Sequence, residues 1–155
     1  MKKSGFFLGL FLLTLLVNAQ VKQNADGLYV GADGSIFTGT FVNTENGVKK
    51  SEIEIKNGLF SGEAKYFYAS GKVMETGMFD NGQKDGKWLR FNESGLTVGL
   101  AIYNMGKKNG TWMVWDDTGK KRFEMHYHMG EKTGVWSNWS ETGELISSKD
   151  YATTN

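Results

Sequence analysis

Glycine recurs every 24 residues along this chain of 155 residues, in three parallel series. Such self-similarity is typical of repeat proteins, in which each unit buries apolar surface only against its neighbours. We therefore expect a stack of about five supersecondary units rather than a globular domain around one enclosed pocket. The three series are Gly34, Gly58, Gly82, Gly106 and Gly130; Gly47, Gly71, Gly95, Gly119 and Gly143; and Gly62, Gly86, Gly110 and Gly134.

Each unit contains two short runs rich in aromatic, β-branched and apolar residues, which is a strand pattern. The first runs are KYFY, KWLRF, TWMVW and VWSNW, and the second are KVMETGMF, LTVGLAIY, KKRFEMHY and ELISSKDY. Short loops ending in glycine join the runs within a unit, and the connectors NGQKDG, MGKKNG and MGEKTG join the units. Joints this short permit only antiparallel pairing, because a parallel crossover needs about a dozen residues or more.

The predicted fold is therefore all-β: an elongated single-layer antiparallel β-meander of about five β-hairpin repeats of 24 residues each. Four units are clear, and a more degenerate unit over residues 29–61 precedes them. The third glycine series opens each clear unit, so the connectors are expected to turn as well as the loops.

The N-terminus has the pattern of a secretory signal peptide over residues 1–19. Lys2 and Lys3 precede an apolar run over residues 6–17, and the small residues of Val-Asn-Ala at 17–19 resemble a cleavage site. The apolar run is shorter than the roughly 20 residues of a transmembrane helix, so no stable transmembrane anchor is expected. The predicted location is outside the cytoplasm: periplasm, cell surface or secreted. The predicted organisation is signal peptide 1–19, linker 20–28, repeat domain 29–151 and tail 152–155.

Charge and composition exclude several functions. Without Lys2 and Lys3 the chain carries 16 Lys and Arg against 17 Asp and Glu, and no basic stripe marks a nucleic-acid partner. Cysteine and proline are absent. The chain also lacks a Gly-x-Ser-x-Gly elbow, a cysteine nucleophile and a phosphate-binding Gly-x-x-x-x-Gly-Lys sequence. We therefore predict a protein without enzymatic activity and without a cofactor.

Aromatic residues recur at fixed positions of the unit, and equivalent positions should stack along the sheet as ladders. In a regular strand, the second and fifth positions after the third-series glycine face opposite sides, unless a bulge intervenes. The candidate binding residues are Trp88, Phe91, Trp112, Trp115, Trp136, Trp139, Tyr103 and Tyr127. Stacked rings of this kind can hold a sugar ring or a quaternary ammonium such as choline, but we favour their interpretation as the core of a thin sheet.

The repeated Gly-x-Trp-x-x-aromatic strand resembles the MORN repeat, and it is most similar to the bacterial variant often labelled antitoxin-like. The residues that carry the resemblance are GKWLRF at 86–91, GTWMVW at 110–115 and GVWSNW at 134–139. The resemblance covers residues 58–151 well and 29–57 loosely. It implies an elongated antiparallel sheet that serves in protein interaction or membrane-phospholipid association, without enzymatic activity of its own.

Three functions remain open at this point. The first is a non-catalytic exported module that binds a protein or a component of the envelope or membrane surface. The second is a repeat protein that binds choline, lipid head groups or glycans on its aromatic ladder. The third is neutralisation of a toxin outside the cytoplasm, as the antitoxin label implies.

A metal site is a weaker hypothesis. Glu124, His126 and His128 alternate along one run and would share a face, which suits metal ligation. No other unit repeats this set, and we interpret it as a solvated polar face, so no metal site is predicted.

Overall fold

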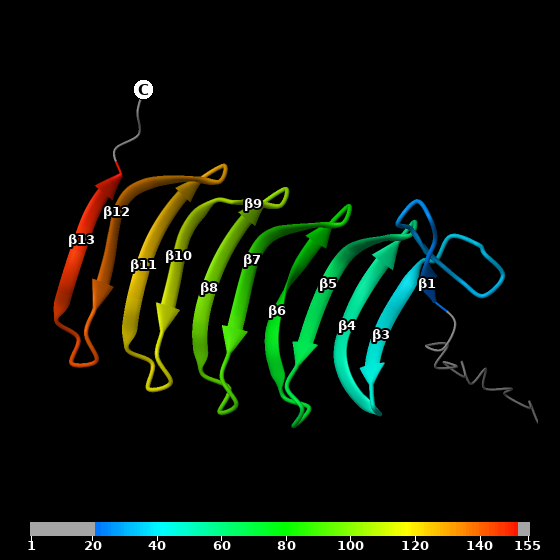
Figure 1. Cartoon of the computed structure of the whole chain (residues 1–155), viewed down its shortest axis with the longest axis horizontal. Coiled ribbons are helices and arrows are strands. Elements are labelled where there is room, and N and C mark those ends of the chain that lie inside the picture. Colours follow the sequence, from blue (N-terminus) through cyan, green and yellow to red (C-terminus); the bar gives the residue numbers. More distant parts are fainter. Residues whose placement is uncertain (1–20, 152–155) are drawn as a thin grey trace, which may run out of the picture.

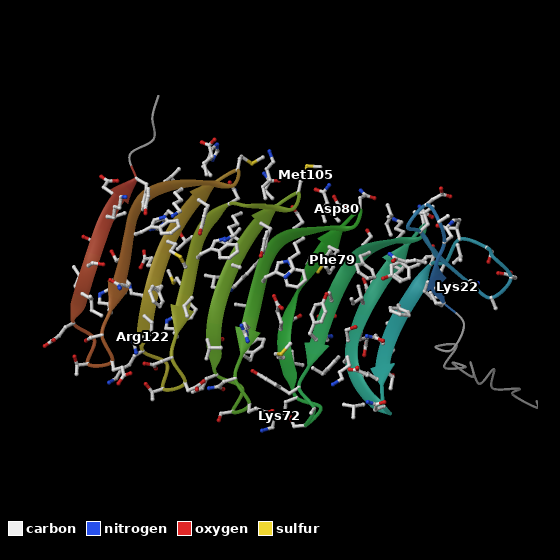
Figure 2. The ribbon with its side chains drawn as sticks, in the orientation of Figure 1. Lys22, Lys72, Phe79, Asp80, Met105 and Arg122 are labelled. Atoms are coloured by element: carbon white, nitrogen blue, oxygen red, sulfur yellow. The ribbon has the colours of Figure 1, made fainter. Side chains whose placement is uncertain are left out.

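The computed structural model describes residues 21–151, which form an open antiparallel sheet of eleven strands and a small N-terminal hairpin (Figure 1). Neighbouring strands in the sheet are neighbours in the chain, and both β9 and β10 pair with β8. The all-β meander is confirmed, and residues 21–151 contain no helix. The predicted signal peptide at 1–19 and tail at 152–155 lie outside the described residues. The strands of the sheet are β3 (Gly39–Glu45), β4 (Val48–Lys56), β5 (Leu59–Phe67), β6 (Val73–Asp80), β7 (Gln83–Phe91), β8 (Thr97–Asn104), β9 (Lys107–Lys108), β10 (Gly110–Trp115), β11 (Lys121–His128), β12 (Glu131–Trp139) and β13 (Leu145–Tyr151).

The loops within the units close on the second glycine series, as predicted. In the first clear unit, the Gly71 N–H donates to the Tyr68 carbonyl at 3.0 Å, and the Tyr68 N–H donates to the Lys72 carbonyl at 2.9 Å. Gly71 has a φ of 83°, a conformation that costs a residue with a side chain more than it costs glycine. The equivalent glycines have φ between 84° and 89°: Gly95, Gly119 and Gly143.

The connectors between units are shorter turns than the prediction allowed. Asn81 and Gly82 alone form the first of these turns, with φ of 45° and 81°. Two successive residues with positive φ are typical of the type I′ turn, whose twist suits a β-hairpin. The rest of the connector belongs to the next strand, so β7 begins at Gln83 and is longer than the run KWLRF.

The third glycine series therefore lies inside strands and not at a turn. Thr76 pairs with Leu89, whereas Met78 pairs with Asp85, so residues 86–88 of β7 face the single residue Gly77 of β6. Such a bulge adds residues to one strand and bends it. Gly86 enters the bulge with a φ of 64°. The same register shift occurs between β4 and β5 and between β11 and β12, and Figure 1 shows β5, β7 and β12 bending near the upper edge of the sheet.

Backbone hydrogen bonds join each turn to the unit before it. The Gly106 N–H donates to the Lys84 carbonyl at 2.8 Å, and the Gly130 N–H donates to the Lys108 carbonyl at 2.7 Å. The Asp85 carboxylate also accepts a hydrogen bond from the Met105 N–H at 3.0 Å. The first glycine series thus supports the turn and also contacts the preceding repeat.

The two faces of the sheet differ in burial. One face, which we call the ladder face, carries the rings that stack from strand to strand and the core residues Ile53, Ala64 and Trp88, each at most 3% exposed. The opposite side, which we call the second face, carries the side chains that alternate with them, such as Leu89 and Leu100. The sheet has no second layer, so this one face supplies most of the core.

The N-terminal end of the sheet is closed by residues 22–37. In this segment β1 (Lys22–Gln23) pairs with β2 (Tyr29–Val30), within and beside the stretch predicted as a linker. The Tyr29 N–H donates to the Gly58 carbonyl at 2.9 Å, and the Tyr29 ring stacks on Phe60 with centroids 4.9 Å apart. Val30 is 4% exposed. The aromatic ladder therefore begins with a ring of the small N-terminal hairpin rather than with a ring of the large sheet.

Candidate functional site

The eight candidate residues do not form one site, because they lie on both faces of the sheet. Trp88 pairs with Ala101, and Tyr103 follows on the same face of β8, whereas Leu89 pairs with Leu100 on the other side. Phe91 lies three residues after Trp88 in β7 and therefore faces the second side. The ladder face holds Trp88, Tyr103, Trp112, Tyr127 and Trp136, and the second face holds Phe91, Trp115 and Trp139.

The three tryptophans of the ladder face occupy equivalent positions. Each indole N–H donates to the carbonyl of the residue ten positions earlier: Trp88 to Met78 at 3.1 Å, Trp112 to Ile102 at 2.9 Å, and Trp136 to His126 at 3.0 Å. That carbonyl belongs to the preceding strand at its bulge. Each indole is therefore bonded to the backbone of the neighbouring strand, which gives it a structural role.

The tryptophans differ in burial because their neighbours differ in size. Beside Trp88 lies Gly77, and a Cβ placed on Gly77 would overlap the indole ring. The equivalent neighbour is Ala101 beside Trp112 and Met125 beside Trp136. Trp88 is only 1% exposed, whereas Trp112 and Trp136 are half-buried. The core is thus densest around β6 and β7 and opens toward the C-terminal strands.

The rings form one continuous ladder. From Phe79 onward the centroids of successive rings lie 5.0–6.4 Å apart and most pairs are tilted or edge-on, which is a favourable aromatic geometry. The members from β2 to β13 are Tyr29, Phe60, Phe79, Trp88, Tyr103, Trp112, Tyr127, Trp136 and Tyr151.

A lysine lies over each ladder tryptophan, and the sequence interpretation missed these lysines. The ammonium of Lys84 lies 3.6 Å from the Trp88 ring centroid, that of Lys108 lies 4.4 Å from Trp112, and that of Lys132 lies 4.3 Å from Trp136. These are cation–π distances. The signal was available, because a lysine stands at the fourth position of all three connectors.

These lysines bear directly on the choline hypothesis. A quaternary ammonium would need the ring faces that Lys84, Lys108 and Lys132 already cover. Its positive charge would also meet three like charges, which disfavours binding. The contacts on the ladder face therefore favour an anionic or neutral ligand over a cationic one.

On the second face, Trp139 lies beneath a different lysine. The Lys121 ammonium is 4.1 Å from the Trp139 ring centroid and 2.7 Å from the Glu124 carboxylate. The hydrogen bond from Lys121 is the main reason that the pKa of Glu124 lies below its usual range, and the charge of His126 adds to the shift. This part of the second face is therefore a polar surface of ion-paired side chains that covers one aromatic ring.

The histidine set remains a polar surface. His126 Nε2 lies 3.4 Å from the Glu124 carboxylate, and His126 Nδ1 lies 3.3 Å from the Thr111 hydroxyl. His128 pairs with Glu131 in the register of β11 and β12. Across residues 21–151, no three His, Asp or Glu side chains come together as metal ligands.

The ladder face is hollowed at two places. An open groove of about 440 Å³ lies over β11 to β13, lined in part by Phe123, Met125, Trp136, Lys149 and Tyr151. A smaller hollow of about 180 Å³ lies over β7 to β10 beside Trp88 and Trp112. Burial raises the pKa of the Tyr103 hydroxyl in this region, and the Glu75 carboxylate adds to the effect. Both hollows are open to solvent rather than enclosed.

Two segments of the chain, residues 60–81 and 108–129, match a family model described as the MORN repeat variant. The matches begin 48 residues apart, which is twice the glycine period, and each covers a β-hairpin, β5–β6 and β10–β11. Both segments are thus similar to the MORN repeat, which generally serves in protein or membrane interaction and is generally non-catalytic. No curated protein matches the chain. Among the described residues, no helix has the length and apolarity needed to cross a membrane.

Proposed function

We propose that this protein is an exported, non-catalytic interaction module that presents the ladder face of its sheet to a protein of the cell envelope. The observation that carries the proposal is a single-layer sheet whose structural rings are topped by lysines and flanked by open grooves. A buried core would not need such a row of charged side chains. The pattern of residues 1–19 supports export.

Several features support a binding role over catalysis. The grooves are wide and shallow, whereas catalysis favours concave sites with convergent polar groups. On the ladder face, burial raises the pKa of Tyr66 and Tyr103 further above neutral pH, which does not suit these groups to acid–base catalysis near neutral pH. Neutralising a toxin outside the cytoplasm is one form of the same proposal, in which the bound protein is the toxin.

The test is capture of partners from an envelope extract by the mature protein, with untagged protein as competitor. The proposal predicts one or a few proteins that are retained saturably and released by the competitor. Retention of membrane vesicles or of glycans with no protein would contradict it. Turnover of a defined substrate by the pure protein would show that the module is an enzyme instead.

A further inference from the structure

Charge is divided unequally between the two faces of the sheet. Apart from the bulged strand ends, the pairing register from β3 to β13 assigns five cationic side chains and one carboxylate, Glu75, to the ladder face. The second face carries eight carboxylates, including Glu52, Glu124 and Asp150, and also six cations such as Lys87 and Lys107, so its charges nearly balance. The ladder face is thus positive in a nearly neutral chain. Its cations are Lys84, Arg90, Lys108, Lys132 and Lys149.

Most of these cations have no anionic partner in the structure. Lys84 bonds the Glu75 carboxylate at 3.1 Å. Within residues 21–151, no carboxylate lies within 4 Å of Arg90, Lys108, Lys132 or Lys149. The uncompensated charge therefore lies over β7 to β13, beside the groove of about 440 Å³.

The groove supplies an apolar contact next to the charge. Phe123, on its floor, is 45% exposed, which is high for a phenylalanine in a strand. Met125 and Tyr151 line the same groove, and Lys149 lies among them. A partner that combines negative charge with an apolar or ring-shaped side chain would cover both features.

We propose that the ladder face binds an extended acidic segment of a partner protein, laid across the strands with its carboxylates on Lys108 and Lys132. The inference rests on the proposed function and names the chemistry of the partner. The segment would run along the row of lysines, and an apolar or proline side chain would enter the groove over β11 to β13. Charge complementarity identifies the occupant.

The spacing of the lysines specifies the conformation of that segment. Lys84, Lys108 and Lys132 lie on β7, β9 and β12, which are two strand positions apart, or roughly 9.6 Å at about 4.8 Å per strand. A polyproline II helix has about three residues per turn and a rise of about 3.1 Å, so every third residue recurs on one side about every 9.3 Å. An acidic residue at every third position of such a segment would match the lysines. Aromatic surfaces are a common recognition site for this helix.

The experiment measures fluorescence anisotropy of a labelled peptide of repeated Pro-Pro-Glu triplets on the protein. A comparison peptide has the same composition with its glutamates contiguous. The test variant is Lys108→Gln with Lys132→Gln on the ladder face. The matched control is Lys87→Gln with Lys107→Gln, which removes the same charge from exposed positions on the second face. Melting curves of both variants verify folding, and Lys132→Gln alone replaces the test variant if it does not fold.

We expect the triplet peptide to bind wild type and control equally, and the test variant about tenfold more weakly, as two ion pairs of modest strength would give. The contiguous peptide should bind more weakly than the triplet peptide. Equal binding of the two peptides, or an equal loss in the control, would overturn the proposal. Absence of peptide binding would also overturn it, as would binding of anionic vesicles or a polyuronate alone.

Failure of this inference is distinguishable from failure of the proposed function. A partner captured from the envelope extract by wild type and equally by the test variant would leave the interaction module standing and reject the acidic segment. A captured partner that the triplet peptide releases would support both.

Discussion

Truncating the three ladder tryptophans one at a time should destabilise the protein by amounts that follow their burial. Trp88 is 1% exposed and touches Phe79 and Tyr103, so Trp88→Ala removes a fully buried ring and its hydrogen bond to the Met78 carbonyl. Such a change costs about 3–5 kcal/mol in the free energy of unfolding. Trp136 makes the equivalent hydrogen bond to the His126 carbonyl but is half-buried, so Trp136→Ala should cost about half as much.

The assay is urea unfolding followed by both fluorescence and far-UV circular dichroism, together with a thermal melt. One kcal/mol shifts the melting temperature of a domain of this size by about 3–5 °C. We therefore expect a fall of roughly 15 °C for Trp88→Ala and roughly 7 °C for Trp136→Ala, with Trp112→Ala between them. If Trp88→Ala does not fold, replacing each of the three tryptophans by phenylalanine allows the same comparison of stability losses. Equal losses at the three positions, or the largest loss at Trp136, would refute the reasoning.

Three smaller predictions concern the turns and the second face. Met105→Asn should raise the free energy of unfolding by about 0.5–1 kcal/mol, because Met105 has a φ of 46° and asparagine tolerates that region better. Urea midpoints measure this gain, and an unchanged midpoint would contradict it. Asp85→Ala should cost about 1 kcal/mol by leaving the Met105 N–H without its acceptor, and the combination with Met105→Asn should retain that loss. Glu124 has a folded pKa below its unfolded value, chiefly through the hydrogen bond from Lys121, so its contribution to stability is present above about pH 4.5 and is lost as pH falls through the folded pKa. The difference in stability from Glu124→Gln, below about 1 kcal/mol, should therefore disappear in acid, and urea midpoints measured as a function of pH check it.

The sequence predicts the fold well because the glycine series report local backbone conformation. The second series is bounded by loop residues, and Gly71 closes a loop with positive φ as expected. The third series was assigned to turns, but Gly86 forms a bulge inside β7. Glycine serves both roles for the same conformational reason, and the spacing alone does not separate a two-residue turn followed by a bulge from one longer connector.

The site was only partly predictable, because burial depends on the strand beside each residue. Trp88 and Trp136 stand at one position of the repeat, yet Gly77 admits the first ring fully and Met125 does not admit the second. The pairing register across the bulge decides which small residue meets which ring. The lysine row was visible in the connectors, but its contact with the rings follows from the two-residue turn, which places Lys108 in a strand.

Site-specific photo-crosslinking in the native host tests the central claim most directly. A photoreactive phenylalanine analogue replaces Val114, which is 37% exposed on the ladder face, or Val135, which is 47% exposed on the second face. The account predicts that the ladder-face position forms a discrete adduct with an envelope protein and that the second-face position does not. Adducts only from Val135, or adducts from neither position in folded protein, would contradict it.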